Sequence, residues 1–155
     1  MKPIILFSIF IFVLTTASRA DKPPVVETGS VTPMPSQWID EDTRHKIIHL
    51  TSRGGENRSF YFHNNPFVTG QGKGGDRMVF YGNENSDMQL FSVDLKTGKA
   101  DQITNKKAVS GEIISMHGRE VYYQCGDSVF ATGIENHKTR LIYVFPENAR
   151  GHITT

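Results

Sequence analysis

The stretch Ser92-Val-Asp-Leu-Lys-Thr-Gly-Lys-Ala-Asp-Gln-Ile-Thr104 predicts two short strands joined by a hairpin tip at Lys96-Thr97-Gly98. A diverged copy follows as Thr132-Gly-Ile-Glu-Asn-His-Lys-Thr-Arg-Leu-Ile-Tyr143. Phe130, just before this copy, and Ile142 within it stand 39 positions after Phe91 and Ile103. A fainter copy precedes both, from Ile39 to Thr51. A period near 40 residues with several strands in each period is typical of β-propeller blades.

The remaining pattern predicts an all-β chain. Val121, Tyr123 and Cys125 alternate with Tyr122 and Gln124, which is the period of a strand, and no segment has a sustained helical period. We expect one four-stranded antiparallel blade over residues 59–103, a second over 111–143, and the outer hairpin of another blade over 39–50. The first blade would begin with a short aromatic strand over 59–67 that ends in a turn at Asn65-Pro66, and the second would have a strand over 112–116.

This gives about two to two and a half blades, whereas a closed ring needs about four to eight. We therefore expect an incomplete ring: a fragment, a truncated product, or part of an assembled ring. Its partners would be the missing blades or other copies of the chain, bound through the open edges.

The N-terminal segment has the features of an exported protein. Residues 1–20 combine a basic start, an apolar core and small residues before Ala20, which predicts a cleaved secretory signal peptide, with an uncleaved anchor as the alternative. Residues 21–37 are rich in proline and are interpreted as a linker, so the partial propeller would span 38–155. The expected location is periplasmic or secreted, with no membrane attachment after cleavage.

The charge balance argues against a nucleic-acid partner, and the cysteine content excludes an internal disulfide. The chain has 17 basic and 16 acidic residues, so no nucleic-acid partner is expected. Cys125 is the single cysteine and cannot form an internal disulfide, which leaves core packing to stabilise the fold.

Some segments resemble the N-terminal part of oligogalacturonate lyases, the propeller enzymes of pectin breakdown. The more specific ones are Trp38-Ile-Asp-Glu-Asp-Thr43, Ile48-His-Leu50 and Phe60-Tyr-Phe-His-Asn-Asn-Pro-Phe67. Met78-Val-Phe-Tyr81 and Val93-Asp-Leu-Lys-Thr-Gly98 are similar to blade strands of that family and of the wider TolB-like and WD-like propellers.

The resemblance implies β-elimination on oligogalacturonides. A base would remove the proton next to the sugar carboxylate, a divalent cation or an arginine would neutralise that carboxylate, and an acid would assist the leaving group. In the full-length family the metal, of the manganese type, is held by histidine-rich later blades, so this chain would carry no metal ligands and no catalytic residue. It would form at most one wall of the substrate cleft and be inactive alone.

Four residues are candidates for contact with the substrate. The inner strand of a blade lines the channel where propellers bind ligands, so Arg58, His63 and Asn64 could reach a sugar carboxylate or hydroxyl. The alternative is that His63 and Asn64 bond to the backbone of a local turn. His152 would either enter the channel of an intact ring or belong to a frayed terminus.

Two other functions remain open at this stage. The chain could belong to a non-enzymatic TolB-like periplasmic propeller that binds a protein, or to the propeller domain of a secreted peptidase. We expect a Gly-x-Ser-x-Gly motif downstream in the peptidase.

Overall fold

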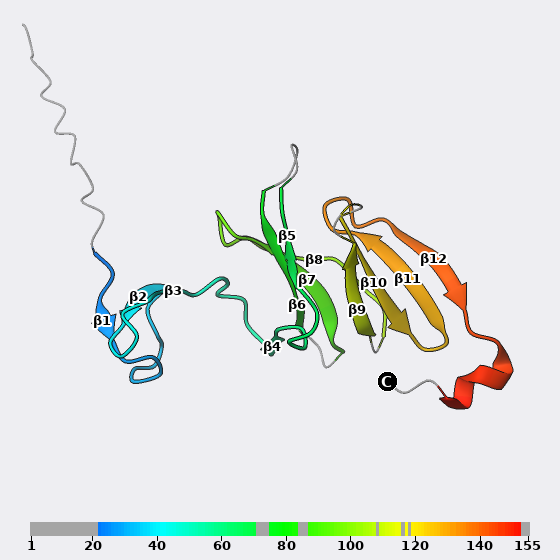
Figure 1. Ribbon diagram of the computed structural model, residues 1–155, viewed down its shortest axis with the longest axis horizontal. Helices are drawn as coiled ribbons and strands as arrows, with labels where there is room; N and C mark the ends of the chain where they lie inside the picture. Colours follow the sequence, from blue (N-terminus) through cyan, green and yellow to red (C-terminus); the bar gives the residue numbers. More distant parts are fainter. Residues whose placement is uncertain are drawn as a thin grey trace, which may run out of the picture. The chain divides into compact units, whose positions relative to one another are not determined.

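The computed structural model describes residues 22–70, 75–83, 87–107, 109–115, 117 and 119–152, with the backbone alone for 150–152. The predicted signal peptide, residues 1–20, lies outside them. The chain divides into two compact units, one ending at Ile48 and one beginning at His49. Twelve β-strands and one 3-10 helix make up the regular structure of the described residues, which confirms the all-β class (Figure 1). Within these ranges we find no helix with the length and apolar character needed to cross a membrane.

The first unit is a small three-stranded sheet of β1 (Val25–Val26), β2 (Gln37–Asp40) and β3 (Lys46–Ile48). β2 and β3 form the expected antiparallel hairpin, whereas β1, which comes from the segment interpreted as a linker, pairs with β2 in parallel.

The carboxylate of Asp40 holds the turns of this unit together. It accepts hydrogen bonds from the hydroxyl of Thr28 (2.6 Å) and from the hydroxyl and amide of Thr43 (2.7 and 2.9 Å). The buried indole of Trp38 donates to the Thr28 hydroxyl at 3.0 Å. The hydrogen bonds from Thr28 and Thr43 hold the pKa of Asp40 far below its ordinary value, because they favour the charged form.

The first blade is a sheet in which β6 (Arg77–Gly82), β7 (Gln89–Asp94) and β8 (Ala100–Gln102) follow one another as antiparallel neighbours. On the side of β6 away from β7, two short strands pair with it: β4 (Asn57–Arg58) and β5 (Phe67–Val68). Residues 59–66 lie between these strands and are not themselves strand, so the strand expected from Ser59 to Phe67 is wrong over most of its length.

The second blade has four antiparallel strands in the order β12-β11-β10-β9. They are β9 (Val109–Ser115), β10 (Glu120–Cys125), β11 (Ser128–Gly133) and β12 (Thr139–Val144). After it comes the 3-10 helix η1 (Glu147–His152). Sheets of antiparallel strands following one another along the chain agree with the predicted partial propeller.

The 39-residue repeat is visible in the backbone of the two hairpin tips. The Gly98 amide donates to the Asp94 carbonyl (2.8 Å), and 39 residues later the His137 amide donates to the Gly133 carbonyl (2.9 Å). Both tip residues have positive φ, 71° at Gly98 and 55° at His137. The second blade therefore repeats the turn of the first, although a histidine replaces the glycine.

The side chains repeat as well. Phe91 stacks on Phe80 with ring centroids 5.8 Å apart, and Phe130 stacks on Tyr123 at 5.9 Å, both with interplanar angles of 26°.

A cation from the segment before each blade covers the repeated ring. The guanidinium carbon of Arg53 lies 4.0 Å from the Phe91 centroid, and Nζ of Lys106 lies 4.6 Å from the Phe130 centroid. The repeat thus includes the segment that leads into each blade.

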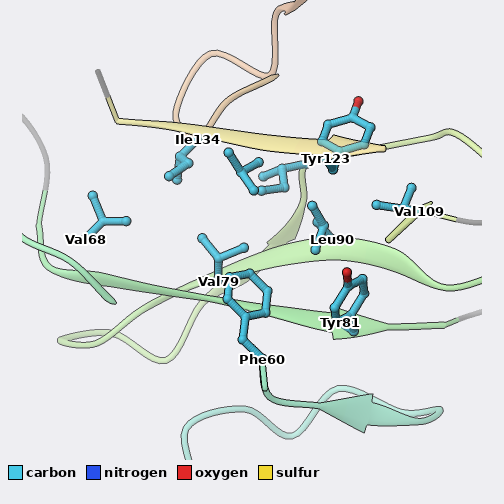
Figure 2. Close-up of a cluster of buried hydrophobic side chains, with 10 residues drawn as sticks. Phe60, Val68, Val79, Tyr81, Leu90, Val109, Tyr123 and Ile134 are labelled. Carbon is cyan, nitrogen blue, oxygen red and sulfur yellow. The ribbon is translucent and has the colours of Figure 1, made fainter. Parts of the chain in front are cut away.

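The main hydrophobic core lies between the two sheets of the second unit, as Figure 2 shows. The first blade contributes side chains such as Val79 and Leu90, and the second contributes Val121, Tyr123 and Ile134, all at most 1% exposed. Each such side chain stabilises the fold by about 1.5–3 kcal/mol relative to an exposed one. This shared core holds the edge strands β4 and β9 in the same unit, and the candidate site is built there.

Candidate functional site

The loop of residues 59–66 replaces the middle of the edge strand of the first blade. Phe60 anchors it, because its ring is buried and packs edge-on against Tyr81 at 5.7 Å between centroids (Figure 2). The backbone N–H of Asn64 closes a turn by donating to the Tyr61 carbonyl at 2.8 Å. As a result the rings of Tyr61 and Phe62 remain 65% and 77% exposed and lie 4.4 Å apart. Two adjacent aromatic side chains exposed to this degree form a small apolar surface that is a candidate for binding.

A hollow of about 670 Å³ opens beside this loop. Its lining comes from the first-blade segment 58–62 with Tyr81, and from Ser110, Gly111 and Glu112 of β9 in the second blade. A volume of this size falls within the range of small-molecule sites. The hollow therefore combines exposed aromatic rings with one cation, Arg58, and one carboxylate, Glu112.

Arg58 is an exposed cation with unused hydrogen-bonding capacity. Its guanidinium carbon lies 5.2 Å from the centroid of the Tyr81 ring. Among the described residues its side chain has no ion pair and no hydrogen bond. A guanidinium presents five N–H donors in a planar fork that matches a carboxylate, so this side chain is suited to bind an anionic group.

A β-bulge aims Glu112 into the space between the blades. In the β9–β10 pairing, Gly111 and Glu112 together lie opposite the single residue Tyr123. Gly111 has a φ of 64°, the left-handed conformation that glycine adopts without strain. Bulges of this kind redirect a side chain, and Glu112 is only 6% exposed as a result.

The buried carboxylate of Glu112 is bonded to the first blade. It accepts a hydrogen bond from the hydroxyl of Tyr81, and Nδ2 of Asn64 lies 3.5 Å from its Oε1 and donates to its backbone carbonyl at 3.1 Å. Burial, and then the bond to Glu112, raise the pKa of Tyr81 well above its ordinary value. Tyr81 is therefore neutral and donates its proton toward Glu112 across the physiological pH range.

The structure brings three of the four predicted site residues to one edge of the first blade. Arg58 lines the large hollow, while His63 and Asn64 line a neighbouring hollow of about 250 Å³ beside Ile113 and Ile114. The His63 ring packs on Phe62 with centroids 3.9 Å apart. The side-chain amide of Asn64 donates to the Glu112 carbonyl of the other blade, so it does not bond to the backbone of its own turn as the alternative interpretation expected. His152 lies at the end of η1, and its side chain is outside the described atoms.

Four residues of the hollow were not predicted as site residues from the sequence: Tyr61, Phe62, Tyr81 and Glu112. The aromatic run was interpreted as part of a strand, and Glu112 as an ordinary strand position. One signal was present: a glycine inside a strand pattern, here Gly111, often marks a bulge.

In the part of the chain that the structure describes, no three side chains of histidine, cysteine, aspartate or glutamate come together in a way that could hold a metal ion.

Comparisons with known proteins find the same architecture in solved lyases. An oligogalacturonate lyase from Vibrio parahaemolyticus matches with a TM-score of 0.60 and 24% identity, over 72% of this chain and 29% of that one. An oligogalacturonate lyase in complex with manganese matches with a TM-score of 0.60 and 19% identity, over 71% of this chain and 29% of its own. No protein-family model matches the sequence, and neither does any curated protein.

These likenesses establish the fold. The all-β blades are shared with oligogalacturonate lyase structures, so the resemblance seen in the sequence is supported at that level. The chain spans less than a third of the length of the solved proteins that it matches.

Proposed function

We propose that this chain is exported and forms the N-terminal blades of an oligogalacturonate-lyase-type propeller, which breaks pectic oligogalacturonides by β-elimination. The observation that carries the proposal is the structural likeness to two oligogalacturonate lyases over about 72% and 71% of the chain. The position of the candidate site supports it, because the loop 59–66 interrupts the edge strand that would line the channel of a ring.

In this proposal the chain binds the substrate and does not perform the chemical steps. Arg58 supplies a positive charge for a sugar carboxylate, His63 and Asn64 lie on the loop that follows it and line the neighbouring hollow, and His152 would join them in a complete ring. Neutralising the carboxylate lowers the cost of removing the neighbouring proton, which is the difficult step of the elimination.

The divalent metal would be held by other blades. One of the solved lyases was determined with manganese, and a divalent ion suits the neutralisation of a carboxylate. The described residues of this chain do not fit such a centre, because the carboxylate of Glu112 already accepts a hydrogen bond from Tyr81 and no histidine contacts it.

A turnover assay tests the proposal. The chain alone, given trigalacturonate and manganese, should release no unsaturated product as measured by ultraviolet absorbance. A longer protein in which this chain is continuous with the remaining blades should release it. The alanine variant of Arg58 in that longer protein should show a raised KM, whereas the control Lys96→Gln, on an exposed hairpin tip, should match the parent. Robust turnover by the isolated chain would contradict the division of roles.

A protein-binding propeller is the alternative, and one observation favours it. All six residues of β12 are exposed, and four of them, residues 141–144, are large apolar side chains. An exposed edge strand of this kind can pair with a strand of another protein. Under this alternative, charged substitutions at Ile142 would abolish capture of the partner, and trigalacturonate would not change the thermal stability of the chain.

A further inference from the structure

We propose that the hollow between β4 and β9 is a subsite for one uronic acid residue, held in a single orientation by Arg58 at its rim and Glu112 at its base. The inference rests on the proposed function and extends it to specificity: the subsite selects the free sugar acid over its methyl ester. It uses two residues, Tyr81 and Glu112, whose role the sequence pattern does not reveal.

Tyr81 separates the two charges of the subsite. Its ring packs under the guanidinium of Arg58, with 5.2 Å from the guanidinium carbon to the centroid, and its hydroxyl donates to the carboxylate of Glu112. The cation therefore lies over the face of the same phenol whose hydroxyl bonds the carboxylate, so the two charged groups flank one side chain. A ligand that reaches both residues must present an anionic group to Arg58 and a hydrogen-bond donor to Glu112.

The charges determine how a uronic acid can enter. A sugar carboxylate at the base would lie beside the carboxylate of Glu112, and the burial of Glu112 leaves the repulsion between these two like charges poorly screened. At the rim the same group finds the free fork of Arg58, which can form two charge-assisted hydrogen bonds. The carboxylate must then point to Arg58, and a hydroxyl on the opposite side of the sugar can donate to Glu112, which retains free lone pairs.

The aromatic side of the hollow suits the face of the sugar. Tyr61 and Phe62 expose most of their rings, 4.4 Å apart, on the loop that lines the opening. The C–H groups on one face of a pyranose are weakly positive and apolar, and aromatic faces carry negative potential. This contact is the same for the acid and for its ester, so it supplies affinity without discriminating between them.

Calorimetric titration of the chain with trigalacturonate and with its fully methyl-esterified form tests the subsite. The two ligands share rings and hydroxyls and differ in charge, so their affinity ratio measures the preference for the free acid. We expect the acid to bind at least about tenfold more tightly at low salt, since a hydrogen bond to a charged group contributes about 1.5–3 kcal/mol. Added salt should reduce this ratio.

Four variants assign the contacts. Arg58→Gln should remove the preference for the acid and leave the affinity for the ester unchanged, whereas Phe62→Ala should weaken both ligands by a similar factor. Glu112→Gln should also weaken both, because it loses a charged acceptor for the hydroxyl. Lys96→Gln, an exposed cation outside the hollow, is the matched control and should change neither. Arg58 and Phe62 are exposed, so their variants keep the test valid even if Glu112→Gln unfolds.

The results separate this inference from the proposed function. Loss of the preference in Arg58→Gln supports the subsite even if the longer protein has no lyase activity. Failure of the chain to bind either ligand, or a preference that survives in Arg58→Gln, overturns the subsite even if the longer protein is an active lyase.

Discussion

The hydroxyl of Tyr81 on β6 donates a hydrogen bond to the carboxylate of Glu112 on β9, and this bond joins the two blades at the base of the candidate site. Both side chains are buried, and they stand 31 residues apart in the sequence. The bond also connects stability to binding, because the same carboxylate is the proposed acceptor for a sugar hydroxyl.

Tyr81→Phe should lower stability and change its dependence on pH. The folded protein raises the pKa of Tyr81 above the ordinary value of 10.0, so the stabilisation is fully present below pH 10 and is lost as the pH rises above it. We expect a loss of about 1–3 kcal/mol at pH 7, because a buried carboxylate loses a donor, and a weaker decline of stability above pH 10. Urea unfolding at pH 7 to 11 measures both. Tyr143→Phe, at an exposed tyrosine of β12, is the control; an identical alkaline profile for Tyr81→Phe and the parent would contradict the assignment.

Gly111→Ala should destabilise the bulge that aims Glu112. The nearest atom to an added Cβ is Cβ of Gln124 at 4.0 Å, so there is space, and the cost arises from the positive φ of 64°. We expect about 1–2 kcal/mol from this strain in thermal unfolding. Gly54→Ala, which has no such φ and open space around it, should be nearly neutral. If the two substitutions lowered the thermal stability equally, the prediction that a side chain at residue 111 strains the bulge would be wrong.

Replacing the cations that cover the repeated aromatic rings should destabilise the fold unequally. Arg53 lies over Phe91 and also donates two hydrogen bonds to the Asn83 carbonyl at 2.8 Å, whereas Lys106 only covers Phe130. Lys106→Ala should cost about 0.5–1 kcal/mol in urea unfolding, and Arg53→Ala should cost more. Arg53→Lys should fall between Arg53→Ala and the parent, since it keeps the charge and loses the planar fork. A smaller cost for Arg53→Ala than for Lys106→Ala would contradict this order.

Substitutions at the two hairpin tips should change the stability of the chain in opposite directions. His137→Gly should stabilise the chain by about 0.5–1 kcal/mol, because it relieves a non-glycine residue at a φ of 55°. Gly98→Ala should destabilise it, since φ is 71° and the new Cβ would lie 3.3 Å from the Leu50 carbonyl oxygen. Thermal unfolding of both variants measures the effects, and the prediction fails if they have the same sign.

Asp40→Asn should loosen the first unit and alter its response to acid. The pKa of Asp40 is lowered below its ordinary value of 3.8, so its stabilising contribution is present above that pH and is lost as the pH falls below it. Trp38 is the single tryptophan and donates to the Thr28 hydroxyl that bonds Asp40, so its fluorescence reports on this unit. We expect the variant to show at neutral pH the emission that the parent shows in acid. Asp42→Asn, at an exposed neighbour, should behave as the parent does.

The local parts of this fold could be predicted from the sequence. The hairpin of β7 and β8 and its copy in β11 and β12 follow from alternation and turn residues within a dozen positions, and the 39-residue repeat follows from comparing them. Arg58, His63 and Asn64 were placed near one strand edge for the same reason, since they are neighbours in the chain.

The broken edge strand could not be predicted in this way. Residues 59–66 have the aromatic content of a strand, but Phe60 packs into the core and its neighbours Tyr61 and Phe62 are left exposed on a loop. Tertiary packing thus overrides the local preference, as it commonly does for short aromatic segments.

By itself the sequence determined the all-β class, the blade repeat and the hairpin tips, because strand alternation and turn chemistry act between residues close in the chain. Only the tertiary structure decided that Arg58, the aromatic loop and Glu112 share one hollow. That arrangement depends on two sheets burying a common core and on a bulge at Gly111 that turns one carboxylate toward a tyrosine of the other blade. Contacts between distant segments of this kind leave no periodic trace in the sequence.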